Sequence, residues 1–266
     1  MKEKIKHKIQ HNRDRAIAVF KWVLFSFITG LILGAVGAVF AKAIVYVTEL
    51  RKSHMQLLLL LPIGAAVIAA LYKLLHEEGD RGTDSIIATI HGDEEVPLKL
   101  APLIFVSTIF SHLCGASVGR EGAALQMGGS IGNGIGRLFK FEQNDKNTMI
   151  MCGMSAVFSA MFGTPIAAAV FSMEVVSVGI MHYAALVPCV ISAFVARRVA
   201  ELFGLNSPFY DIEYIPAFNL KNALIIIGVA VACGLVSLCF CMVLHKGGRL
   251  VRRYIENRYI RGVAGG

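Results

Sequence analysis

Apolar residues dominate this chain in long runs, and the charged residues are gathered between the runs and at the two ends. A helix of about 20 apolar residues is long enough to cross the hydrocarbon core of a bilayer. Several runs approach or exceed this length, so the pattern predicts an all-α, polytopic membrane protein. The runs cover residues 23–45, 57–75, 98–118, 149–178, 184–199 and 223–244.

Small residues and a proline refine the prediction for the first two runs. We expect residues 21–50 to form one long helix. Glycines at three- and four-residue spacing would give this helix a small-residue stripe that allows close packing against other helices: they are Gly30, Gly34 and Gly37. Pro62 lies within the next expected helix, where neighbouring helices can satisfy the carbonyl that a proline leaves free.

A turn signal divides the fourth run. Gly163-Thr164-Pro165 lies near the middle of residues 149–178. Because a residue that precedes proline is biased away from helical geometry, we expect two helices to meet at this point. Interrupted membrane helices are typical of substrate sites in transporters.

Composition and charge agree with a membrane location. Of the 266 residues, 56% are hydrophobic and only 17% are charged, whereas about a quarter are charged in a typical soluble domain. The net charge of +8 comes largely from the two ends, so we expect a basic segment at 1–18, a transmembrane domain at 19–245 and a second basic segment at 246–266. Under the positive-inside rule both ends should be cytoplasmic in a multi-pass protein of the cell membrane.

The same distribution argues against other classes of partner. Basic residues confined to the ends of membrane helices do not indicate nucleic-acid binding, and we expect none. The six cysteines all fall in apolar runs without the spacing of metal ligands, so neither a metal nor a cofactor is expected.

Three polar stretches are expected to connect the helices. Residues 76–99 should form a loop followed by a short amphipathic helix. Residues 137–147 should be a charged surface connection, and residues 206–219, with two prolines and two acids, an external loop.

An arginine–glutamate pair stands out because it lies among glycines between apolar runs. Arg120 and Glu121 are flanked by Gly119 and Gly122. A charge at membrane depth is unfavourable by a few kcal/mol or more, so we expect Glu121 to be buried for a functional reason. A helix that begins near Glu121 would direct free N–H groups and its positive end at a neighbouring anion.

A second ionisable residue lies in an apolar run. Glu174 follows the break at Gly163-Thr164-Pro165. It is either a functional group within the membrane or a glutamate near a helix end that reaches interfacial water.

Two blocks of sequence make the chain recognisable. The first reads Gly119-Arg-Glu-Gly-Ala-Ala-Leu-Gln-Met-Gly-Gly-Ser-Ile-Gly132 and resembles the glycine-arginine-glutamate-glycine signature of the CLC family of chloride channels and proton-coupled anion exchangers. The second reads Gly163-Thr-Pro-Ile-Ala-Ala-Ala-Val-Phe-Ser-Met-Glu174 and resembles the family's segment that leads to a glutamate near the cytoplasmic side. The resemblance implies a CLC-like fold of interrupted, tilted helices that comprises the first of two inverted repeats and the start of the second. It also implies a homodimer in contact with membrane lipids, and chloride or fluoride as the transported ion.

The resemblance implies specific roles around the first block. Glu121 would be the gating glutamate, whose carboxylate occupies an anion site until protonation or displacement admits an anion. Arg120 would offset its charge and keep the site attractive to anions. The amides of Gly122 and Ala123 would be anion donors, although Ala123 stands where the family usually has proline.

The resemblance implies two further positions. Gly82-Thr83 falls where the family has an anion-binding loop, so Thr83 is either an inner anion contact or part of an ordinary connecting loop. Glu174 would be a proton-pathway candidate. Val175 stands where proton-coupled members usually have a second glutamate, which argues against ordinary proton coupling.

These observations predict a chloride channel or CLC-type anion transporter. Two alternatives within the family remain: a fluoride/proton antiporter, which can carry Gln-Met as at Gln126-Met127, and a truncated fragment that does not transport. An intramembrane enzyme is not expected, because the sequence contains no nucleophile–base or metal-binding motif to accompany Glu121.

Overall fold

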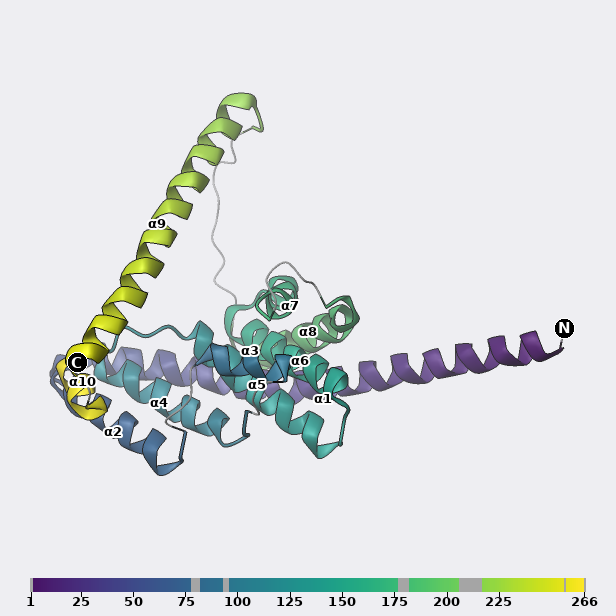
Figure 1. Cartoon of the computed structure of the whole chain (residues 1–266), viewed down its shortest axis with the longest axis horizontal. Coiled ribbons are helices and arrows are strands. Elements are labelled where there is room, and N and C mark those ends of the chain that lie inside the picture. Colours follow the sequence, from purple (N-terminus) through teal and green to yellow (C-terminus); the bar gives the residue numbers. More distant parts are fainter. Residues whose placement is uncertain are drawn as a thin grey trace. The chain divides into compact units, whose positions relative to one another are not determined.

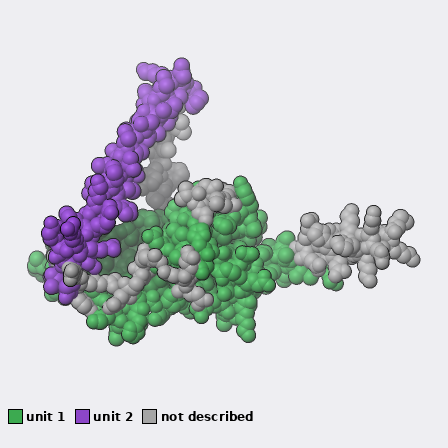
Figure 2. Space-filling view, viewed as in Figure 1, with its two compact units in different colours: residues 1–207 green, residues 208–266 purple. Residues whose placement is uncertain are grey.

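The computed structural model describes residues 2–77, 82–92, 96–176, 182–205, 217–255 and 257–265, and these residues are helical with short connections and contain no strand (Figure 1). The chain divides into two compact units, Met1–Ser207 and Pro208–Gly266 (Figure 2). The expected all-α class is confirmed.

The first unit contains most of the helices. In order they are α1 (Lys2–Ser53), the short 3-10 helix η1 (Met55–Leu60), α2 (Leu61–Leu74), α3 (Thr83–His91), α4 (Leu100–Cys114), α5 (Glu121–Leu138), α6 (Gln143–Phe162), α7 (Pro165–Glu174), the 3-10 helix η2 (Tyr183–Ala185) and α8 (Leu186–Leu202).

The second unit contains α9 (Leu220–Tyr254) and α10 (Arg258–Gly265). Asn219 caps α9, because its side-chain oxygen accepts the backbone N–H of Asn222 at 2.8 Å. Residues 206–216 of the expected external loop lie outside the described residues.

Four helical segments are long and apolar enough to cross a membrane, judged by length and composition in the described part of the chain. They are Ile17–Ser53, Met55–Leu74, Tyr183–Leu202 and Leu220–Tyr254, and they correspond to four of the predicted runs. The run at 98–118 forms the 15-residue α4, and the run at 149–178 is divided between the 20-residue α6 and the ten-residue α7. Gly115 ends α4 by adopting a left-handed conformation with φ of 85°, and Gly163, with φ of 72°, ends α6 at the predicted break before Pro165.

The core of the first unit is built around α6. Its side chains are almost all buried from Thr148 to Ala160, and it packs against α1, α5, α7 and α8. Serine hydroxyls link α6 to α8: Ser155 donates to the carbonyl of Cys189 at 3.1 Å, and Ser159 donates to that of Ala193 at 2.7 Å. Such bonds between apolar helices stabilise packing where water supplies no alternative partner.

The glycine stripe of α1 packs as expected. A Cβ added at Gly30 or Gly34 would come within 3.0 Å of atoms of α8, and one added at Gly37 would lie 2.9 Å from the Cβ of Ala160 in α6. The prediction that small residues bring α1 close to its neighbours is therefore confirmed.

Two local predictions are wrong. Pro62, expected inside a helix with its freed carbonyl satisfied by neighbouring helices, lies in the first turn of α2, where its missing N–H is not needed. The connection predicted at 137–147 is shorter in the structure and covers only residues 139–142, because the charged stretch continues as the first turns of α6. There Asp145 forms an ion pair with Lys21 of α1, a long-range contact that the local sequence does not reveal.

Candidate functional site

Glu121 is the first residue of α5. The first backbone bond of this helix runs from the N–H of Ala124 to the carbonyl of Arg120 at 3.0 Å. The N–H groups of Glu121, Gly122 and Ala123 therefore precede the helical ladder and point out of its positive end. The predicted helix start at this glutamate is confirmed.

A second helix start adjoins the first. Thr83 opens α3, after Gly82 has turned the chain with φ of 74° and ψ of −138°, a conformation that favours glycine. A Cβ added at Gly122 would lie 3.4 Å from the Oγ1 of Thr83. The starts of α3 and α5 thus meet beside Glu121, with the hydroxyl of Thr83 against Gly122. Thr83 therefore lies against the start of α5, and both readings of it, an anion contact or part of a connecting loop, stay predictions.

Gln126 lies near the same two helix starts, although the sequence did not identify it as a site residue. Its side chain is only 8% exposed, and its Nε2 lies 4.0 Å from a Cβ built at Gly82. A spacing of four residues puts Gln126 on the same helix face as Gly122. The signal that could have identified it is a polar side chain about one helical turn after Glu121, the acid of the first sequence block.

The expected burial of Glu121 is wrong for this structure. Both Glu121 and Arg120 are exposed, although the start of α3 lies against Gly122, the next residue of α5. Arg120 forms no ion pair with Glu121 among the described residues; its guanidinium carbon lies 5.2 Å from the ring centroid of Phe162 instead.

The contact between Arg120 and Phe162 joins the two recognisable blocks of sequence. Phe162 is the last residue of α6, and the break at Gly163-Thr164-Pro165 follows directly. The signature segment and the helix interruption are therefore neighbours in space, although about 40 residues separate them in the sequence.

Glu174 lies away from this site. It is the last residue of the ten-residue α7, which puts it roughly 13 Å along the helix axis from Pro165. It is partly buried, and two residues later the carbonyl of Val176 contacts the Nε2 of His91 at 3.2 Å. Since His91 ends α3, this helix has its start beside Glu121 and its end beside the segment that follows Glu174.

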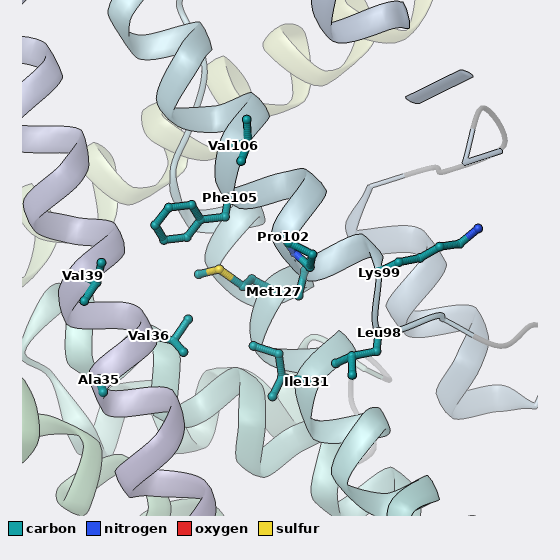
Figure 3. Close-up of a pocket in the computed structure, with 11 residues that line it drawn as sticks. Ala35, Val36, Val39, Leu98, Lys99, Pro102, Phe105, Val106, Met127 and Ile131 are labelled. Atoms are coloured by element: carbon teal, nitrogen blue, oxygen red, sulfur yellow. The ribbon is translucent and has the colours of Figure 1, made fainter. Parts of the chain in front are cut away.

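A separate groove opens between α1, α4 and α5 (Figure 3). Its volume is about 800 Å³, and ten of its eleven lining residues are apolar, among them Val36, Phe105 and Met127. The exception is Lys99, whose ammonium donates to the carbonyl of Leu75 at 2.7 Å and pairs with Glu77 at 3.0 Å. This lining does not suit an anion, so we assign the candidate site to the helix starts.

Residues suited to hold a metal do not come together in the part of the chain that the structure describes. No group of three or more histidine, cysteine, aspartate or glutamate side chains is arranged there as a metal site. The chemistry that the helix starts offer is hydrogen bonding to an anion.

Comparison with known proteins identifies relatives of the chain. The sequence model of the family described as "Voltage gated chloride channel" matches residues 63–266. The "Chloride/fluoride channel protein" of Pseudomonas syringae pv. tomato is 35% identical over 249 residues, which are 93% of this chain and 55% of that protein. The "H(+)/Cl(-) exchange transporter ClcA" of Vibrio parahaemolyticus is 28% identical over 176 residues, which are 60% of this chain and 38% of that protein.

A solved structure is similar as well. The crystal structure of a CLC-type fluoride/proton antiporter superposes with a TM-score of 0.88 at 30% sequence identity. The match covers 93% of this chain and 63% of the antiporter's chain. The chain therefore spans little more than half the length of the first of these relatives, and the resemblance seen in the two sequence blocks is confirmed.

Proposed function

Because the chain belongs to the family of voltage-gated chloride channels, we propose that it contributes an anion pathway through the membrane, with Glu121 as the gating group. The observation that carries this proposal is the meeting of two helix starts at Thr83 and Gly122, immediately beside Glu121. Members of this family are channels and transporters, so the chemistry proposed is passage of an ion and not the making or breaking of a covalent bond.

The physical basis is the unsatisfied amide groups at the helix starts. Each start contributes leading N–H groups and the positive end of a helix dipole, and together they replace part of the water shell that an anion loses in the membrane. The carboxylate of Glu121 carries the same charge as the anion and lies at the same helix end. It therefore competes with the anion when ionised and yields the site when protonated.

Fluoride is the first anion to test, with chloride second. The Pseudomonas relative is named for both anions and the antiporter for fluoride. A small anion of high charge density also gains more from close N–H and O–H donors than a large one, because the electrostatic energy grows as the separation falls.

The test is ion efflux from proteoliposomes, followed with fluoride and chloride electrodes, together with a matched pair of threonine variants on α3. Thr83→Val removes the hydroxyl beside Gly122 and is expected to slow efflux about tenfold, the worth of one hydrogen bond to a charged group. Thr89→Val removes a hydroxyl that donates to the carbonyl of Ser85 in the same helix, and should leave efflux within about twofold of wild type. Wild-type efflux no faster than that of empty liposomes would refute the proposed function.

Proton-coupled exchange is the second candidate, favoured by the similarity to the fluoride/proton antiporter. Glu174 is the proposed proton-pathway residue, because it is an ionisable, partly buried side chain at the end of α7 distant from Glu121. Glu174→Gln is expected to lower proton uptake at least about tenfold while anion efflux continues, since a proton relay loses its carrier.

The control for this measurement is Glu201→Gln on α8, where the carboxylate pairs with Arg197 and Arg198. Proton uptake is followed with a pH electrode in weakly buffered medium. Uptake that survives in Glu174→Gln would remove this residue from the pathway, and a wild type without any anion-driven proton uptake would leave the channel as the remaining candidate.

A further inference from the structure

We infer that Gln126 is a specificity-determining residue of the anion pathway, which favours fluoride over chloride through its side-chain amide. This inference rests on the proposed function and deepens it. It starts from the position of a buried polar side chain one helical turn inside the gate, next to the start of a second helix.

The face of α5 on which Gln126 lies is the face that meets α3. Gly122 precedes Gln126 by four residues and packs against Thr83, and Gly129 follows by three and packs against Ile86, whose Cγ2 would lie 2.8 Å from an added Cβ. Glycine on both sides lets side chains of α3 approach the backbone of α5 closely, and the amide of Gln126 lies near Gly82, just before the first residue of α3.

The other buried polar side chains on this part of α5 serve the fold. Ser130 donates to the carbonyl of Pro97 at 2.8 Å, and Asn133 donates to that of Val96 at 2.9 Å, so both fasten α5 to the segment before α4. Gln126 differs in position, because it lies beside the two helix starts. Its carboxamide has two N–H donors and one carbonyl acceptor, enough to contact its protein neighbours and still donate to an anion.

The chemistry of such a contact discriminates by size. An N–H donor approaches the smaller fluoride ion more closely and therefore stabilises it more than chloride. An anion that has passed Glu121 and is short of water would meet the amide of Gln126 together with the hydroxyl of Thr83. Removing the amide should then weaken the binding of fluoride more than the binding of chloride.

The experiment compares fluoride and chloride efflux from proteoliposomes for wild type, Gln126→Met and Asn133→Leu. Methionine keeps the length and unbranched shape of glutamine but has no N–H donor, so the packing is preserved. The fluoride-to-chloride ratio is expected to fall about tenfold in Gln126→Met, in line with the loss of one charge-assisted hydrogen bond. Asn133→Leu, which removes a buried amide on the same helix, should lower the melting temperature without changing the ratio.

An unchanged ratio in a Gln126→Met protein that still transports would overturn the inference while leaving the proposed function intact. If either protein fails to transport, anion binding is measured by titrating the purified proteins with sodium fluoride and sodium chloride in a calorimeter. If wild type shows no efflux, the proposed function fails. Where either protein fails to transport, a fluoride-to-chloride affinity ratio that differs between wild type and Gln126→Met supports the role of Gln126, and equal ratios or no binding refute it.

Discussion

Replacing Glu121 with glutamine is expected to leave anion efflux intact and to remove its dependence on protons. The glutamine side chain has nearly the same shape as glutamic acid but no ionisable group, so it cannot compete with an anion as a carboxylate does. In wild type, efflux should rise as the medium becomes acidic, because protonation removes the competing charge at the start of α5. In Glu121→Gln, efflux should be equal at acidic and neutral pH and at least as fast as the acidic wild-type value.

The measurement is anion efflux from proteoliposomes at acidic and neutral pH. Glu142→Gln is a matched control, because Glu142 is also an exposed glutamate at a helix start, that of α6. A Glu121→Gln protein with the same proton dependence as wild type would show that another group gates the pathway.

The sequence was informative wherever local chemistry decides the structure. The start of α5 at Glu121, the break before Pro165 and the glycine stripe of α1 all follow from residue types that favour one backbone geometry or one packing distance. These features were predicted correctly because they need no knowledge of distant parts of the chain.

Features that depend on contacts between distant parts of the chain could not be predicted from the sequence. Residues 143–147 look like part of a charged connection, but Lys21 pairs with Asp145 and Asn147 donates to the carbonyl of Ile90 at 2.9 Å, so this segment is helical and belongs to α6. The place of Gln126 depends in the same way on a helix that begins about 40 residues earlier. Membrane depth was also a poor guide to the burial of Glu121, because burial depends on which elements cover a helix start.

The crossing of α5 and α6 gives the prediction with the largest effect on stability. A Cβ added at Gly153 of α6 would overlap the backbone carbonyl of Gly128 in α5, and one added at Gly128 would overlap that of Gly153. Neither helix backbone can yield as a flexible side chain can, so the helices must separate. Gly153→Ala is expected to lower the free energy of unfolding by about 2–3 kcal/mol, the usual penalty for overpacking. Because α5 carries Glu121, anion efflux should fall as well.

Gly134→Ala is the matched control, on α5 itself. The three atoms nearest to an added Cβ there all belong to the side chain of Leu98, the closest being its Cδ1 at 2.9 Å, and the end of this side chain can move. Alanine also favours helix over glycine by roughly 0.5–1 kcal/mol, so this variant should be neutral or slightly stabilised. Melting temperatures in detergent would show a fall of roughly 5–10 °C for Gly153→Ala only. Equal melting temperatures for both variants would contradict the close approach of α5 and α6.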